Sequence, residues 1–316
     1  MTRLLLSSVI FAAYMPFCGP LAARPTEPAD VAQRHMRELW SAPDDVAAQD
    51  MIDGPWGRAY APDPRTPFVF AHEKTHGVSP GYEARDDEGR EWSVKFGDEG
   101  HVEVVVSRVL SALGYHQPPV YYVDHFRLTD KTGTHDQGGA RFRPKIKELK
   151  DRGEWSWQRN PFVGTRPYQG LLVILMLFDS TDLKNDNNTL YEFKDGRRTE
   201  SWYVVRDLGS GLGETGRLDP KRNDVALLEK DRFVTGVHHR FVDFDYHGFH
   251  QELFKNRITP EDVRWACDLA GQLTDRQWRV LFAGAGYEPG PAAAFIAALQ
   301  KRIDQGRHIE TRTTVR

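Results

Sequence analysis

The apolar run from Tyr168 to Phe178 constrains the fold more than any other part of this sequence. Its residues are hydrophobic almost all the way round a helix, and a helix of that kind is buried on every face. A polar segment, Thr181–Leu190, follows after a short link. The chain must therefore enclose one helix completely and present a polar loop directly at its end.

Length and composition allow a large globular fold. The 316 residues are enough for one large domain or for two lobes around a cleft, each with its own core. With 40% hydrophobic and 28% charged residues, the chain is neither fibrous nor disordered. The formal net charge of −3 gives no overall attraction to nucleic acid or to an anionic membrane, so we expect no nucleic-acid partner.

A basic stretch between residues 141 and 150 is a local departure from this balance. Acidic neighbours compensate for it, and we interpret it as a solvated face rather than as a site for a polyanion. Its members are Arg141, Arg143, Lys145, Lys147 and Lys150, with Glu148 and Asp151 nearby.

The first residues have the order of a secretory signal. A positive start at Arg3 precedes the apolar run Leu4–Phe17, and the small residues Ala22 and Ala23 offer a cleavage site. The run is too short to span a bilayer comfortably, which takes about 20 residues. We therefore expect residues 1–23 to be a cleaved signal peptide and the protein to be exported, periplasmic or secreted, without a stable membrane span. An uncleaved N-terminal anchor is the alternative.

Hydrophobic patterns divide the remaining chain into three parts. Residues 24–67 are rich in Pro, Ala and Asp, and we expect a leader segment that either packs on the domain or remains loose. Residues 68–147 predict a β-rich N-lobe with one helix. Residues 148–316 predict a mainly helical C-lobe. The predicted class is α+β and bilobal, with a cleft between the lobes.

Individual elements follow from periodicity and from local signals. Apolar pairs with a turn at Asp86–Gly89 predict strands across Phe68–Phe96, and a helical stripe predicts a helix over Glu103–Leu113. Two strands are expected on either side of a turn at Lys194–Arg197. Thr259 and Thr274 each stand at the N-terminal cap of a predicted helix.

The Thr181–Leu190 loop contains the residue types that phosphoryl transfer requires. This chemistry needs a carboxylate near the acceptor hydroxyl and oxygen ligands for the divalent metal on the nucleotide phosphates. Asp182 and Asn187 have a suitable spacing for these two roles. Further along, a strand delivers Asp207 into a turn containing Gly209, an arrangement that suits a second metal ligand.

Two other aspartates of this region are rival bases. They are Asp179 and Asp186, and an alignment anchored on Tyr191 and Glu192 would give the catalytic role to Asp186. We prefer Asp182, because only Asp182 leaves an asparagine at the metal-ligand spacing.

The upstream half supplies candidates for holding phosphates. Lys95 lies in a predicted strand between apolar residues, which suits an ammonium held over the α- and β-phosphates, although by itself it would also fit a surface lysine. Glu103 is predicted at the start of the next helix, where the helix dipole favours an acid, and it would orient Lys95. The turn Gly77–Gly81 lies where a phosphate-covering loop would be, with Gly81 as its contact. A plain hairpin turn is the alternative.

Taken together, these residues resemble the protein-kinase superfamily. Its catalytic loop carries an Asp and an Asn at the spacing of Asp182 and Asn187, and its next strand ends in an Asp-x-Gly turn like Asp207–Gly209. The segment Asp182–Leu190 resembles the catalytic loop of type II phosphatidylinositol 4-kinases. The segment Asp207–Gly213 is similar to the metal-binding turn of the secretory-pathway casein kinases, and HipA-type bacterial kinases share the same plan. Ser180-Thr181 replaces the usual histidine-arginine pair, as in these atypical families.

The resemblance covers about residues 75–215 and implies a kinase-like fold and activity. It implies an enzyme that uses ATP with Mg²⁺ or Mn²⁺ to phosphorylate a hydroxyl of a protein, lipid or small molecule. Asp182 would be catalytic, Lys95, Glu103 and Gly81 would bind the nucleotide, and Asn187 and Asp207 would bind the metal. The alternatives are an exported pseudokinase-like binding module without phosphotransfer and a nucleotidyl (AMP) transferase on the same fold.

Overall fold

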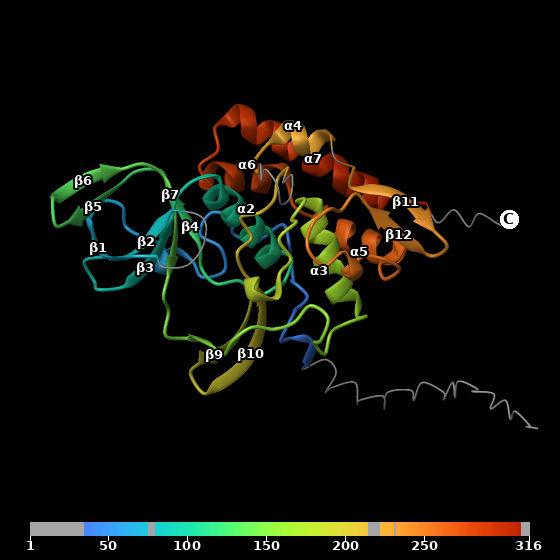
Figure 1. Cartoon of the computed structure of the whole chain (residues 1–316), viewed down its shortest axis with the longest axis horizontal. Coiled ribbons are helices and arrows are strands. Elements are labelled where there is room, and N and C mark those ends of the chain that lie inside the picture. The colour runs from blue at the N-terminus through green and yellow to red at the C-terminus, as the bar shows by residue number, and fades with distance from the viewer. Residues whose placement is uncertain (1–34, 75–79, 214–221, 231, 311–316) are drawn as a thin grey trace, which may run out of the picture.

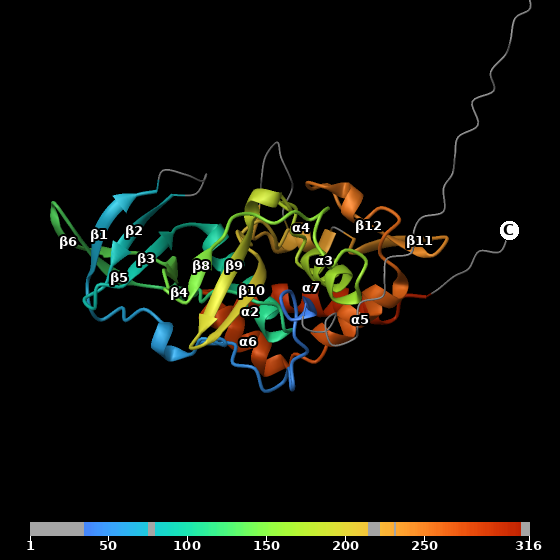
Figure 2. The ribbon, with the colours of Figure 1, turned by 90° about the horizontal axis from the view of Figure 1, so that it is seen from below.

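The computed structural model describes residues 35–74, 80–213, 222–230 and 232–310. The predicted signal peptide and most of the predicted Gly77–Gly81 turn lie outside these residues. The described chain has a β-rich part and a helical part side by side, and helix α2 (Asp98–Ala112) lies between them (Figures 1 and 2). The predicted α+β class is therefore confirmed.

Seven strands from residues 68–144 form one sheet in the order β4-β7-β3-β2-β1-β5-β6. The strands are β1 (Phe68–Glu73), β2 (Gly81–Arg85), β3 (Glu91–Lys95), β4 (Tyr121–Val123), β5 (Phe126–Asp130), β6 (Gly133–Gln137) and β7 (Ala140–Pro144). Alternation along the central strands directs Trp92, Val94 and Phe142 into a compact aromatic core. The other face of β3 and β7 is left for polar side chains.

The helical part surrounds α3 (Arg166–Leu177), which corresponds to the apolar run in the sequence. Leu171 to Leu177 are all buried, as predicted from their all-round hydrophobicity. α5 (Pro260–Ala270) and α7 (Pro289–Arg307) pack on α3, and α4 (Val225–Lys230) and α6 (Asp275–Gly284) pack on α7. Thr259 and Thr274 form capping boxes at α5 and α6, which confirms both predicted caps.

Two smaller sheets complete the helical part. The first contains β8 (Leu149–Asp151), β9 (Asn188–Asp195) and β10 (Arg198–Val205), and the second contains β11 (Val234–His238) and β12 (Phe241–Phe244). β9 and β10 are the two strands predicted around the Lys194–Arg197 turn. Short 3-10 helices occur at Arg58–Tyr60, Asn185–Asn187 and Gln251–Leu253.

Helix α2 begins at Asp98, one turn before the predicted start at Glu103. Gly97 provides the entry with a φ of 83°, and Asp98 and Glu99 place acidic side chains in the first turn, where the helix dipole favours them. The prediction failed because Gly100 weakens the helical pattern at this point. Glu103 consequently lies inside the helix and not at its N-terminus.

The described part of the leader, residues 35–67, packs on the back of the domain. Trp40 Nε1 donates to the Leu113 carbonyl at 2.7 Å, at the end of α2. Gln277 Nε2, on α6, donates to the Val46 carbonyl at 2.8 Å. Leu39, Val46 and Met51 are buried in the same core as α3. The composition left open whether the leader packs on the domain or remains loose, and its described part packs. No helix among the described residues is long and apolar enough to cross a membrane.

We predict that Gly114→Ala destabilises the protein more than Gly89→Ala. Both glycines have left-handed backbone, with φ of 93° and 77°, and an alanine in this region costs about 1–2 kcal/mol. A Cβ on Gly114 would also lie 2.0 Å from the Ser41 carbonyl oxygen, whereas a Cβ on Gly89 meets nothing within 4 Å. Urea denaturation of both variants measures the difference. Equal losses would show that residues 35–67 do not pack against the end of α2.

Candidate active site

Lys95 ends β3 and turns its side chain away from the aromatic core towards the second half of the chain. Its ammonium lies 2.7 Å from Asp207 Oδ1 and 2.5 Å from Glu99 Oε2. Glu103 Oε2 is more distant, at 4.0 Å. The Lys95 side chain is only 10% exposed, so it is not a surface lysine. Its nearest partner on α2 is Glu99 and not the predicted Glu103.

Glu103 is fully enclosed and binds two arginines of β7. Its carboxylate accepts a hydrogen bond from Arg141 Nε at 3.2 Å and another from Arg143 Nη2. Burial alone would raise the pKa of Glu103, but the two guanidinium groups outweigh that effect and hold this pKa well below its usual range. Glu103 is therefore a permanent carboxylate that joins α2 to the sheet.

The interpretation of residues 141–150 as a solvated face is wrong for Arg141 and Arg143. β7 pairs with β3 so that Arg141 lies opposite Lys95 and Arg143 lies opposite Ser93. Alternation then directs both arginines to the face that carries Lys95. Lys145, in the middle of the same stretch, is exposed and pairs with Glu91, as the interpretation expected.

Asp207 follows β10 in a left-handed conformation, with a φ of 52°. Its side chain is 49% exposed, and Oδ1 faces Lys95. The turn after it packs tightly on α2, because a Cβ on Gly209 would lie 2.7 Å from Glu99 Cβ. A close approach, rather than a positive φ, is thus the reason for glycine at position 209.

The predicted catalytic loop is internally braced. Asn187 Nδ2 donates to the Asp182 backbone oxygen at 2.8 Å and to Asp182 Oδ2 at 3.0 Å. The Lys184 ammonium lies 2.7 Å from Asp182 Oδ1. Asp186 is exposed on the same loop and forms no hydrogen bond or ion pair with the described residues. Asp182 is therefore held in place, whereas Asp186 is not.

The β9–β10 hairpin connects this loop to Asp207. Asn188 is paired with Val205 across the hairpin, and Arg206 N donates to the Asn187 carbonyl at 2.8 Å. Asn187 comes directly before β9 and Asp207 comes two residues after β10, so both lie at the open end of the hairpin. The structure thus brings Lys95, Asp207 and the Asp182 loop into one region.

The donor set of this region suits a magnesium-type ion bound together with phosphates. The Asn187 amide nitrogen faces Asp182, which leaves its oxygen for a metal, and Asp207 has a second carboxylate oxygen besides the one at Lys95. Mg²⁺ commonly takes one or two protein oxygens, with phosphates and water completing its shell. No cluster of three or more His, Cys, Asp or Glu residues that would hold a metal unaided occurs in the described part of the chain. Asn187 and Asp207 remain the predicted ligands.

Gly81 begins β2 and is paired with Lys95. A Cβ at this position would lie 2.3 Å from the Val94 carbonyl oxygen, so strand packing itself requires glycine here. The residues that would cover phosphates, 75–79, lie outside the described chain, and the predicted nucleotide contact of Gly81 stays a prediction.

Four charged residues of the site were missed by sequence reasoning. They are Glu99, Arg141, Arg143 and Lys184. The alternate spacing of the two arginines in the sequence was an available signal for a shared face. Lys184 was detectable as the cation nearest to Asp182 in the loop. Glu99 was hidden because the helix start was placed too late.

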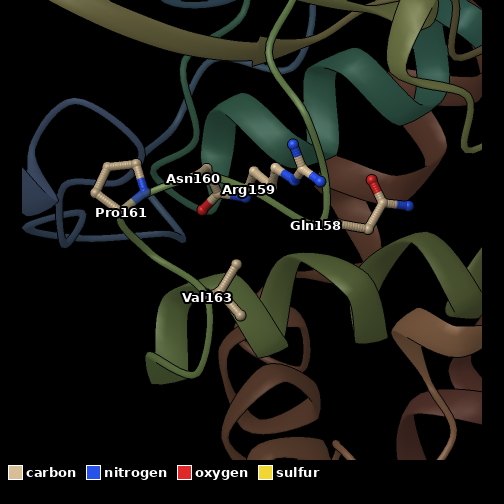
Figure 3. Close-up of a pocket in the computed structure, with 5 residues that line it drawn as sticks. All are labelled: Gln158, Arg159, Asn160, Pro161 and Val163. Carbon is tan, nitrogen blue, oxygen red and sulfur yellow. The ribbon is translucent and has the colours of Figure 1, made fainter. Parts of the chain in front are cut away.

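An open surface pocket adjoins the predicted catalytic loop. It is lined by Gln158, Arg159, Asn160, Pro161 and Val163, on the loop that leads into α3 (Figure 3). Asn185 connects the two loops: its Oδ1 accepts from Trp157 N at 2.9 Å, and its Nδ2 donates to Gln158 Oε1 at 3.3 Å. The pocket therefore lies beside the segment that carries Asp182.

Two kinases are among the solved structures that are similar to this chain. The proinflammatory kinase CtkA of Helicobacter pylori aligns with a TM-score of 0.45 and 10% identity, over 76% of this chain and 95% of that one. The Golgi casein kinase aligns with a TM-score of 0.42 and 13% identity, over 89% and 86%. Its structure with Mn/ADP bound gives a TM-score of 0.41 and 12% identity, over 92% and 88%. No protein-family model and no curated protein matches the chain. At these identities and TM-scores, function has to be argued from the site itself.

We predict that Glu103→Gln lowers the free energy of unfolding by about 3–5 kcal/mol, because it leaves two enclosed guanidinium groups without their carboxylate. Glu91→Gln is the matched control, since Glu91 also binds two cations but has a side chain 38% exposed. An exposed pair of this kind contributes about 0–1 kcal/mol. Chemical denaturation of both variants distinguishes the two environments. A loss below about 1 kcal/mol for Glu103→Gln would mean that Glu103 does not join α2 to the sheet.

Proposed function

We propose that this protein is a kinase-like phosphotransferase that uses ATP with Mg²⁺ or Mn²⁺ to phosphorylate a hydroxyl group. The observation that carries the proposal is the ion pair between the buried Lys95 and the half-exposed Asp207, which are 112 residues apart in sequence. A lysine on a sheet facing a half-exposed carboxylate at a glycine turn is the pairing expected where phosphates and their metal are held.

Lys95 would bind the phosphates. Its ammonium is a compact point charge, and Glu99 Oε2 at 2.5 Å fixes its position from the side of α2. Asp207 and Asn187 would hold the divalent ion, which neutralises charge on the phosphates when it is bound. Because Asp207 binds Lys95 through Oδ1 alone, its second oxygen is left for this role.

Asp182 would act on the acceptor. The Asn187 amide orients Oδ2 of Asp182, and the carboxylate can accept the proton of a hydroxyl that comes within hydrogen-bonding distance. Lys184 offsets part of its charge from the other oxygen. The pocket along residues 158–163 lies next to this loop and offers room for an acceptor, whose identity as protein, lipid or small molecule is open.

We further propose that the protein acts outside the cytoplasm. The support is the signal-like N-terminus, with its positive start, short apolar run and small residues at Ala22 and Ala23. N-terminal sequencing of the exported protein would then begin near Ala23 or Arg24.

Lys95→Ala and Lys95→Arg are both expected to lose phosphate transfer by about 100-fold or more while the protein stays folded. The fold should persist because Asp207 can be hydrated and Glu99 also pairs with Arg222. The Arg variant should fail because a planar fork cannot replace a point charge in an enclosed position. Transfer of the γ-phosphoryl group and melting temperature are measured side by side. Full activity in both variants would defeat the proposal, and retained nucleotide binding without any transfer in the wild type would favour a binding module.

Asp182→Ala should abolish transfer, and Asp186→Ala should change it little. Asp182 is held by Asn187 and Lys184, whereas Asp186 is exposed on the same loop. Asp207→Ala should remove the metal dependence of nucleotide binding. The opposite pattern, with activity lost only in Asp186→Ala, would reassign the base while leaving the phosphotransferase proposal intact.

A further inference from the structure

Cationic side chains are in excess around Glu103. Arg141 and Arg143 share its single carboxylate. Lys74, just after β1, extends beside Gly81, since its Cδ is 3.3 Å from where a Gly81 Cβ would be. Its ammonium forms no hydrogen bond or ion pair with the described residues. Burial, together with Arg141 and Arg143, lowers the pKa of Lys74 to about 7. The protein alone therefore does not neutralise this group of cations.

Arg206 adds a further positive charge on the side of the β9–β10 hairpin. Its guanidinium lies 5.9 Å from the Tyr191 ring centroid, and its carboxylate partner, Asp151, is exposed and 3.8 Å away. Burial lowers the pKa of Arg206, and the positive charge of Arg143 lowers it further. The Nε atoms of Arg143 and Arg206 are both buried without a hydrogen-bond acceptor. Unsatisfied donors of this kind are costly. Both side chains keep some exposed surface, 14% for Arg143 and 32% for Arg206, where an anionic ligand can bind and balance their charge.

We propose that Lys74, Arg143 and Arg206, together with Lys95, form a site for a linear oligophosphate that binds without a divalent metal. The inference rests on the proposed function and deepens it, because it assigns the phosphate tail to cationic side chains rather than to the metal alone. Arginine forks match phosphate oxygens in a bidentate manner, and Lys74 and Lys95 add point charges. The tail of a nucleoside triphosphate and inorganic tripolyphosphate share this chemistry.

The test measures binding to the full chain in EDTA at constant ionic strength. Isothermal titration with tripolyphosphate, ATP and adenosine should show binding of the first two and none of adenosine. Comparable affinities for ATP and tripolyphosphate would show that the site recognises the phosphate tail of a nucleotide. Tighter binding of tripolyphosphate would show that inorganic oligophosphate is the preferred ligand. Both results support the site. Binding of ATP only when Mg²⁺ is present, with no binding of tripolyphosphate in EDTA, would overturn it.

Variants localise the effect. Lys74→Gln and Arg206→Gln should each weaken tripolyphosphate binding by about tenfold or more, the amount expected for one lost charge-assisted hydrogen bond. Arg198→Gln is the matched control. Arg198 begins β10, the strand that ends directly before Arg206, but its side chain is 72% exposed. Equal weakening by Arg198→Gln would show non-specific attraction and overturn the proposal. Arg206→Gln also removes no partner of Glu103, so its folding can be verified by melting temperature. Tripolyphosphate binding in a protein without phosphate transfer would retain this inference and reject the proposed function.

Discussion

The ion pairs between Glu103 and the two arginines of β7 are the interaction on which the site depends. They fix α2 to the sheet, and α2 in turn carries Glu99 to Lys95 and provides the surface on which the Gly209 turn rests. Lys95 then reaches Asp207 across the boundary between the sheet and the helical part. The sheet, the helix and the second half of the chain are thus connected through one network of charges. It is buried at Glu103 and Arg141 and half-exposed at Asp207.

Features that depend on neighbouring residues were accessible from the sequence. The apolar run that became α3, the hairpin turn at Lys194–Arg197 and the two threonine caps are local patterns, and the structure contains each of them. The proximity of Asn187 and Asp207 also follows from a local pattern, because a tight hairpin brings the two open ends of its strands together. The position of the polar loop at the end of a buried helix followed from the same reasoning.

The sequence did not reveal which face of a strand would be buried or at which residue a helix would start. Arg141 and Arg143 alternate on β7, but only the pairing of β7 with β3 shows that they face Lys95 and not solvent. Glu99 became the partner of Lys95 because α2 starts at Asp98, and the glycines at 97 and 100 conceal that start in the sequence. A difference of one helical turn was enough to exchange the roles of two glutamates.

Residues 35–67 belong to the same folding unit as the helical part, although they precede the sheet in sequence. Leu39, Val46 and Met51 fill the helical core, although the chain reaches them before it enters the sheet. A shortened protein beginning at Phe68 would expose that apolar surface and leave the Trp40 contact at the end of α2 unmade. In a newly synthesised chain, residues 35–67 would therefore lack these contacts until α6, near the other end of the chain, has been synthesised. Such a closure between distant segments raises the mean sequence separation of contacts, a property associated with slower folding.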